Sequence, residues 1–275
     1  MPNEEQLKFW DNEGGEFWAG EADDLDIFLS PLNDVILTAA DLKPGEKVLD
    51  IGCGPGALTL AAAALTGSAL GIDLSSQLIS VGKSRASLQG SFAEFIHADA
   101  ATYQADLPAD VLISRIGVMF FDQPIEAFAK LRKGATHNAR MVFASWAPIS
   151  QNPWIKELLA PLKSLLPNGL PDKESGTPGP FSLSEPHHVK AVLSKAGWKD
   201  ISVSTWEDTL GVPADSPEQA ASFFAKINPA ARTAANQGAP EEEIISRLTT
   251  HYQKQLERDG DIIIRGAALL VTAKV

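Results

Sequence analysis

One segment constrains the fold of this chain more than any other: a short apolar strand, a glycine-rich loop and an alanine-rich helix in immediate succession. The strand is expected at residues 46–51, the loop at 52–56 and the helix at 57–65. The alternation continues with strands expected at residues 68–73, 92–98, 111–114 and 141–146, and with helices expected at residues 75–88 and 124–133. Strands that alternate with helices at this spacing predict a parallel sheet covered by helices on both faces.

The second half of the chain follows a different rhythm. Residues 147–181 contain seven prolines, too many for one continuous helix or strand. We therefore expect two cap insertions into the α/β core, at about 147–185 and about 212–260. The elements expected around them are helices opened by a capping box at 182–185 and by Ser216, an amphipathic helix over 240–258, and strands over 201–206 and 262–274.

Charge and cysteine content exclude several classes of function. Among 275 residues, 23 are Lys or Arg and 35 are Asp or Glu, which gives a net charge of −12. A nucleic-acid interface needs clustered basic residues, and an anionic membrane surface would repel this chain. The single cysteine, Cys53, excludes an internal disulfide and a multi-cysteine zinc site. Without a secretory signal pattern or a long apolar run, we expect a cytoplasmic protein without nucleic-acid, membrane or metal partners.

The glycine-rich loop leaves two kinds of cofactor open. Gly52, Gly54 and Ala57 satisfy the G-x-G-x-x-G/A pattern of dinucleotide sites, so an NAD-dependent oxidoreductase has to be considered. Asp50 argues against it, because a carboxylate at the end of the first strand would repel a pyrophosphate at the helix N-terminus. S-adenosylmethionine instead presents an ammonium and a sulfonium, both cationic. An acidic strand end beside the loop favours that ligand.

Two further acids end the next two strands. Asp73 ends the second strand, where a carboxylate can accept hydrogen bonds from both hydroxyls of a ribose. Both cofactors contain that ribose, so Asp73 does not discriminate between them. Asp99 follows the third strand, where it is expected to meet the exocyclic amine of adenine. Three acids at successive strand ends of one sheet edge form a more specific pattern than the loop alone.

The motifs at residues 50–56, 71–75, 98–100 and 114–121 resemble those of class I S-adenosylmethionine-dependent methyltransferases. They are most similar to the bacterial small-molecule branch related to the ubiquinone and menaquinone biosynthesis enzymes. The resemblance implies an α/β, Rossmann-like, doubly wound sheet of seven mostly parallel strands with an antiparallel last strand, together with a helical cap.

The resemblance also implies a set of cofactor contacts. By position, it assigns the methionine end to Gly52, Cys53 and Gly54, the ribose to Asp73 and Leu74, the adenine to Asp99 and Ala100, and the amino-acid moiety to Ser114 and Arg115. We expect Trp10 to join Asp50 in the cofactor site. Trp18, Phe120 and Trp146 are expected to wall the acceptor pocket.

The reaction class is argued from missing motifs. Residues 114–117 lack the Asp/Asn-Pro-Pro-Tyr motif of amino-methylating enzymes, and no carboxylate cluster for magnesium follows the fourth strand. This favours metal-free, in-line methyl transfer to a small-molecule acceptor, with S-adenosyl-L-homocysteine as product. His187 and His188 are candidate general bases, but the catalytic residue remains unassigned. The alternatives are a non-catalytic S-adenosylmethionine-binding regulatory protein and, less favoured, an NAD-dependent oxidoreductase.

Residues 1–45 are expected to form an N-terminal helical lid ahead of a methyltransferase domain over residues 46–275. Trp10 and Trp18 lie eight residues apart, on one face if the stretch is helical. Such a segment could fold over the strand ends and exclude water from the reacting centre. The alternative is that both tryptophans dock on the sheet as permanent core.

Overall fold

A seven-stranded sheet with the order β3-β2-β1-β4-β5-β7-β6 organises the molecule. The computed structural model describes residues 4–104, 107–170 and 178–275. All neighbouring strands are parallel except β7, which runs antiparallel to both β5 and β6. The strands are β1 (Val48–Ile51), β2 (Ala69–Asp73), β3 (Ala93–His97), β4 (Ala109–Arg115), β5 (Ala135–Trp146), β6 (Lys199–Leu210) and β7 (Ile264–Lys274). The predicted fold class is confirmed, and β5 and β6 are longer than expected.

The helices follow the expected alternation over the first half of the chain and break into short pieces in the proline-rich part. The α-helices are α1 (Glu4–Trp10), α2 (Glu13–Gly20), α3 (Ala22–Ala40), α4 (Ala57–Thr66), α5 (Ser76–Gln89), α6 (Pro124–Lys133), α7 (Pro153–Lys156), α8 (Leu159–Leu162), α9 (Pro186–Lys195), α10 (Pro217–Ile227), α11 (Pro229–Asn236) and α12 (Glu241–Asp259). Three 3₁₀ turns are η1 (Val118–Phe120), η2 (Ile149–Gln151) and η3 (Lys163–Leu165).

Local capping signals were largely informative. The Ser75 and Ser216 side chains accept the capping hydrogen bonds of α5 and α10, as predicted. The capping box at 182–185 is wrong: α9 begins after Glu185 without a side-chain cap, and the Ser182 hydroxyl donates to the Met119 carbonyl instead. Helix α11 had no counterpart in the sequence prediction.

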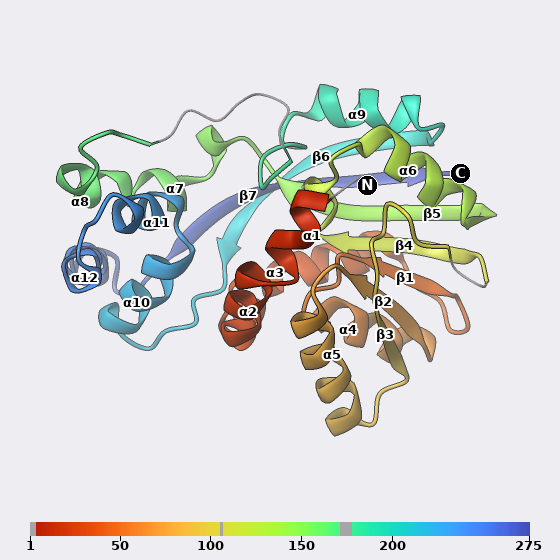
Figure 1. Cartoon of the computed structure of the whole chain (residues 1–275), viewed down its shortest axis with the longest axis horizontal. Helices are drawn as coiled ribbons and strands as arrows, with labels where there is room; N and C mark the ends of the chain where they lie inside the picture. Colours follow the sequence, from red (N-terminus) through yellow and green to blue (C-terminus); the bar gives the residue numbers. More distant parts are fainter. Residues whose placement is uncertain (1–3, 105–106, 171–177) are drawn as a thin grey trace.

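Helices cover both faces of the sheet, as a doubly wound fold requires. Helices α3, α4 and α5 pack on one face, and α6 and α9 pack on the other (Figure 1). Alternation along β4 shows the division, because Val111 and Ile113 point to the first core and Leu112 points to the second. Both faces of the central strands are buried, which explains their continuous apolar runs.

Helix α3 corrects part of the expectation for the N-terminal segment. It packs along the sheet, and one of its faces is fully buried; the buried residues are Ala22, Leu25, Phe28, Leu29, Leu32, Ile36 and Ala40. Such a helix belongs to the permanent core, since its removal would expose the apolar face of β4 and β5. Any moving lid is therefore limited to the residues before α3.

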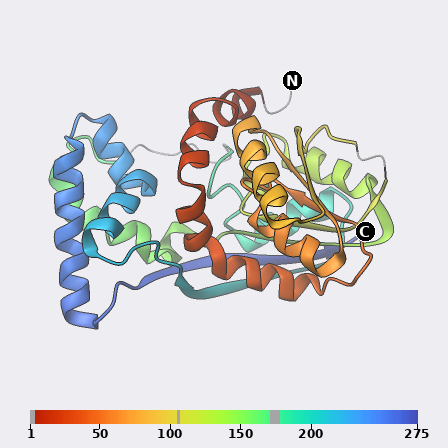
Figure 2. The ribbon, with the colours of Figure 1, turned by 90° about the horizontal axis from the view of Figure 1, so that it is seen from below.

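Helices α7, α8, α10, α11 and α12 gather beyond one end of the long strands β6 and β7 (Figure 1). Residues 171–177 of the first expected cap insertion lie outside the described residues. Figure 2 shows α2 and the start of α3 between this helical group and α5. Lys226 of α10 forms an ion pair of 2.6 Å with Glu21, at the junction of α2 and α3.

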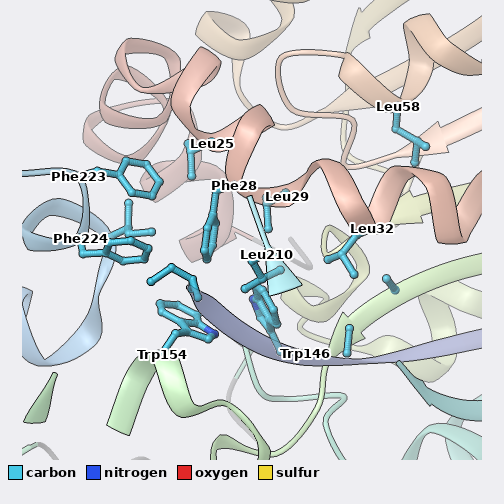
Figure 3. Packing of buried hydrophobic residues seen from close by; sticks show 14 of the residues in the cluster. Leu25, Phe28, Leu29, Leu32, Leu58, Trp146, Trp154, Leu210, Phe223 and Phe224 are labelled. Atoms are coloured by element: carbon cyan, nitrogen blue, oxygen red, sulfur yellow. The ribbon is translucent and has the colours of Figure 1, made fainter. Parts of the chain in front are cut away.

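Phe28 joins α3 to the helical group through an aromatic cluster (Figure 3). Its ring lies 5.5 Å from that of Trp154 and 5.7 Å from those of both Phe223 and Phe224, each edge-to-face. Trp146, at the end of β5, lies 6.4 Å away. Edge-to-face pairs at these distances stabilise a core beyond the area that they bury. One side chain of α3 thus connects the sheet edge with the distant helices.

Replacing Phe28 should therefore destabilise the protein strongly. Phe28→Ala removes a 2% exposed ring with four aromatic neighbours and leaves a cavity, so we expect a loss of about 3–5 kcal/mol in the free energy of unfolding. Ile27→Ala, one residue earlier on the same helix and 47% exposed, should cost less than about 1 kcal/mol. Urea denaturation of both variants measures the difference. Equal losses would contradict the role given to the cluster.

Candidate functional site

A cavity opens at the carboxyl ends of β1, β2 and β4. The sheet order reverses between β1 and β4, which is where doubly wound sheets bind ligands. The predicted residues that line the cavity are Trp10, Trp18, Asp50, Gly52, Cys53, Gly54, Asp73, Leu74, Asp99, Ala100, Arg115, Phe120 and Trp146. Ser114 does not line it. The Ser114 side chain is fully buried, and its hydroxyl donates a 2.7 Å hydrogen bond to the Ile51 carbonyl, so it supports β1 from behind.

The glycine loop depends on backbone conformations that disfavour side chains. Gly52, Gly54 and Gly56 have φ angles of +63°, +55° and +89°. A Cβ on Gly52 would also lie 2.9 Å from the Cα of Gly117, in the turn after β4. Two backbones therefore meet at the floor of the cavity. No role was predicted for Gly117, although a glycine just after a buried strand is a signal of such a close approach.

Asp50 is buried beneath this loop. Its side chain is 1% exposed, and its Oδ2 accepts a 2.6 Å hydrogen bond from the Thr59 hydroxyl on α4. Among the described residues, its Oδ1 has no hydrogen-bond partner. Burial raises the pKa of Asp50 to about 7, against the opposing effects of Thr59 and the Arg115 charge. A buried carboxylate with a free oxygen beside a cavity is suited to a cationic group.

Asp73 ties the loop to the start of α5. One carboxylate oxygen accepts from the Gly54 amide at 2.8 Å, and the other accepts from the Ser75 amide at 2.9 Å. Burial raises the pKa of Asp73, and the two amide hydrogen bonds oppose this effect. Each carboxylate oxygen has a second lone pair, so the side chain keeps acceptor capacity toward the cavity.

Asp99 and Cys53 also line the cavity. The Asp99 carboxylate accepts a 2.8 Å hydrogen bond from the Ala101 amide, which fixes the turn after β3. Cys53 is buried in the glycine loop, and burial raises the pKa of its thiol. A thiol held in its neutral form is a poor nucleophile, so Cys53 serves as a small side chain in a tight loop.

Arg115 is already paired, which the sequence analysis did not foresee. Its guanidinium donates to Asp26 of α3 at 2.7 Å and to the Asn33 side chain at 3.2 Å. Among the described residues that line the cavity, Arg115 is the one cation. Asp26 offsets its charge. Neither Asp26 nor Asn33 could be identified in advance, because they lie more than 80 positions away in the sequence.

Aromatic and aliphatic side chains form the other half of the cavity. The Trp10 ring lies edge-to-face with Phe120 at 5.1 Å and lies 6.3 Å from the Trp18 ring. Further lining residues of this half are Leu25, Leu29, Met119, Trp146 and Pro180. These named lining residues include no titratable side chain. His187 and His188 are exposed on α9 and do not reach the cavity, so neither candidate base is placed at the site.

The N-terminal helices are anchored to α5 next to this wall. Asp11 Oδ1 accepts from the Ser76 amide at 2.9 Å and from its hydroxyl at 2.6 Å. These hydrogen bonds lower the pKa of Asp11. Gly15 lets α2 approach closely, since a Cβ there would lie 2.3 Å from the Ser75 hydroxyl oxygen. Trp10 and Trp18 are thereby held over the cavity.

Comparison with known proteins identifies the fold around this cavity. Residues 48–136 match the family model described as a methyltransferase domain. This match places a methyltransferase domain over about a third of the chain. Within it lie the glycine loop, Asp73, Asp99 and Arg115. An uncharacterized protein of Mycobacterium tuberculosis is 36% identical to this chain over 93 residues. That alignment covers 34% of this chain and 34% of the relative, so it spans about a third of each.

Solved structures extend the methyltransferase fold beyond the domain match. The YcgJ protein of Bacillus subtilis is similar with a TM-score of 0.55 and 16% identity, over 89% of this chain and 98% of that one. Phosphoethanolamine N-methyltransferase 2 of Haemonchus contortus, solved with S-adenosyl-L-methionine, gives a TM-score of 0.58 and 15% identity, over 98% and 59%. At these identities the likeness concerns the fold.

Residues 4–104, 107–170 and 178–275 contain no group of three or more His, Cys, Asp or Glu side chains arranged to hold a metal ion. Within the same ranges, no helix has the length and apolar character that crossing a bilayer requires.

The unpaired Asp50 carboxylate predicts a pH dependence of stability. The pKa of Asp50 is about 7 in the folded protein and 3.8 ordinarily. Between pH 3.8 and pH 7 the folded protein therefore binds a proton at Asp50 that the unfolded chain has lost. Stability contributed by that proton is lost as the pH rises toward 7. From pH 5 to pH 8 this loss should be roughly 2–3 kcal/mol, since each pH unit is worth about 1.4 kcal/mol.

Asp50→Asn should abolish that loss, because an amide keeps the Thr59 hydrogen bond and does not titrate. Urea unfolding at the two pH values, with the exposed Asp34→Asn on α3 as control, measures it. The same slope in Asp50→Asn as in the wild type would show that another group is responsible.

Proposed function

We propose that this protein is an S-adenosylmethionine-dependent methyltransferase acting on a small-molecule acceptor by metal-free, in-line transfer. The observation that carries the proposal is the Asp50 carboxylate, buried beneath the glycine loop with one oxygen unpaired. A pyrophosphate would meet that carboxylate with only an already paired arginine to compensate it. An ammonium or sulfonium would instead supply the cation that the carboxylate lacks.

The remaining cavity fits the other parts of this cofactor. The proposed contacts are Gly52, Cys53 and Gly54 for the methionine end, Arg115 for its carboxylate, Asp73 and Leu74 for the ribose, Asp99 and Ala100 for the adenine, and Trp10 over the top. Ser114 has a supporting role in place of the predicted contact, through its hydrogen bond to Ile51. When bound, the cofactor supplies an electrophilic methyl group.

The aromatic half of the cavity suits an uncharged, apolar acceptor. Trp18, Phe120 and Trp146 give it wide apolar faces, and no described side chain there offers a charge to a phosphate or an ammonium. The protein's contribution to rate is then alignment of the acceptor and exclusion of water.

A non-catalytic cofactor-binding protein is the second candidate function. The observation in its favour is the same lack of a titratable side chain in the aromatic half of the described lining. Turnover separates the two candidates: incubation of a metabolite pool with methyl-labelled cofactor should yield a labelled small molecule. Cofactor binding without any labelled product would favour the second candidate.

Calorimetry tests the choice of cofactor. S-adenosylhomocysteine should bind in the micromolar range, which corresponds to about −8 kcal/mol, and NAD should bind at least a hundredfold more weakly. Mass spectrometry of ligands that co-purify with the protein gives an independent result. Tight NAD binding with no binding of S-adenosylhomocysteine would overturn the proposal.

Asp73 provides a test of the ribose assignment. Asp73→Ala should weaken S-adenosylhomocysteine binding by roughly 2–4 kcal/mol, because it removes charge-assisted acceptors from two hydroxyls. Asp73→Asn should lose less, since its amide oxygen still accepts one hydrogen bond. Titration calorimetry with Asp34→Asn as the control measures both. If both Asp73 variants bind S-adenosylhomocysteine as tightly as the wild type, Asp73 does not contact the cofactor.

We also propose that α1 and α2 act as the lid, with α3 as its fixed base. Gly15→Ala should prevent α2 from docking, because the new Cβ would overlap the Ser75 hydroxyl at the N-cap of α5 as well as the Trp10 carbonyl oxygen. Gly20→Ala, where nothing lies within 4 Å, is the matched control in the same helix. Gly15→Ala should make the segment protease-sensitive even with S-adenosylhomocysteine bound and should change tryptophan fluorescence. Identical behaviour of both variants would reject the docking role.

A further inference from the structure

Three charged side chains from three separate elements meet beside the glycine loop. Asp26 of α3 accepts a 2.7 Å hydrogen bond on its Oδ1 from Arg115, which lies at the end of β4. Its Oδ2 accepts a 2.6 Å hydrogen bond from Arg85 of α5. The Arg115 side chain is 8% exposed and that of Asp26 is 17% exposed. Each carboxylate oxygen therefore holds a different arginine in a largely water-free setting, where such pairs are strong.

Both arginines also contact or line other parts of the site. Arg85 donates a second hydrogen bond, of 3.0 Å, to the carbonyl of Pro55 within the glycine loop. It also pairs with Asp23, one turn before Asp26 on α3. Arg115 lines the cavity itself. The Asp26 carboxylate thus connects the glycine loop, through Arg85, with the cation of the cavity, Arg115.

This arrangement controls both where Arg115 points and how much charge it presents. An arginine side chain has large rotamer freedom, and its planar guanidinium binds a carboxylate well only when its orientation is fixed. Asp26 and Asn33 hold two of its nitrogens. Asp26 and Asp23 together balance the charges of Arg85 and Arg115, so the site has no free cation to attract phosphate groups.

We infer that Asp26 is a positioning residue for the amino-acid end of the cofactor, acting through Arg115 and, by way of Arg85, through the glycine loop. This inference rests on the proposed function, since it takes Arg115 and the loop as the receptors of that end. It assigns a polar binding role to α3, a helix that otherwise contributes the apolar side chains of Leu25 and Leu29 to the cavity.

Asp26→Asn tests this role when two ligands are compared by titration calorimetry. S-adenosylhomocysteine carries the amino-acid end, whereas 5′-methylthioadenosine keeps the adenosine and lacks it. Asp26→Asn should weaken S-adenosylhomocysteine at least tenfold and change methylthioadenosine by less than twofold. Asp34→Asn, an exposed acid on the same helix, should leave both affinities unchanged. Arg85→Gln, which keeps the Arg115 pair and removes the Pro55 contact, should give a smaller loss with the same selectivity.

The outcomes separate this inference from the proposed function. Failure of the wild-type protein to bind S-adenosylhomocysteine would overturn the proposed function. If the wild type binds it and both Asp26→Asn and Arg85→Gln keep that affinity, the positioning role is wrong. Equal weakening of the two ligands would also reject it, because a merely structural change would disturb the adenosine contacts as much. If Asp26→Asn does not fold, the affinities of Arg85→Gln for the two ligands decide whether the positioning role is correct.

Discussion

The buried carboxylate of Asp50 is the constraint around which this site is arranged. It lies beneath a loop of glycines, where the backbone of Gly52 meets that of Gly117 and leaves no room for a side chain. Thr59 partners only one of its oxygens. An unpaired buried acid is costly unless it is protonated or meets a cation. The unpaired carboxylate lies at the edge where a doubly wound sheet binds its ligand, and this position indicates a cationic ligand group.

The one cation among the described residues that line the cavity is balanced by a neighbouring carboxylate. The arginine of the cavity, Arg115, is held by Asp26, and Asp26 is held in place by α3. The same helix carries Phe28 into the aromatic cluster that reaches the distant helices. Helix α3 therefore links core packing with the charge balance of the cavity. We regard this link as the reason that the N-terminal region is part of the site.

Local patterns explain which features could be predicted from the sequence. The strand–helix alternation, the glycine loop and the three strand-end acids depend on neighbours within a few residues, and the fold class was confirmed. The Asp26–Arg115 pair joins residues that are far apart in sequence, so no local pattern indicates it. The Ser182 cap failed because its hydroxyl found a tertiary partner in the Met119 carbonyl. Helix α3 is buried by a sheet whose strands come later in the chain, so its own sequence does not distinguish a core helix from a lid.

Proton release on ligand binding tests the central claim most directly. Asp50 is largely protonated at pH 6, since its pKa is about 7, and a neighbouring ammonium would lower that pKa and displace the proton. Calorimetric titration of S-adenosylhomocysteine at pH 6, in two buffers of different ionisation enthalpy, measures the number of protons released. We predict release of a large fraction of one proton by the wild type and much less by Asp50→Asn. Binding without proton release, or equal release by both proteins, would contradict the account.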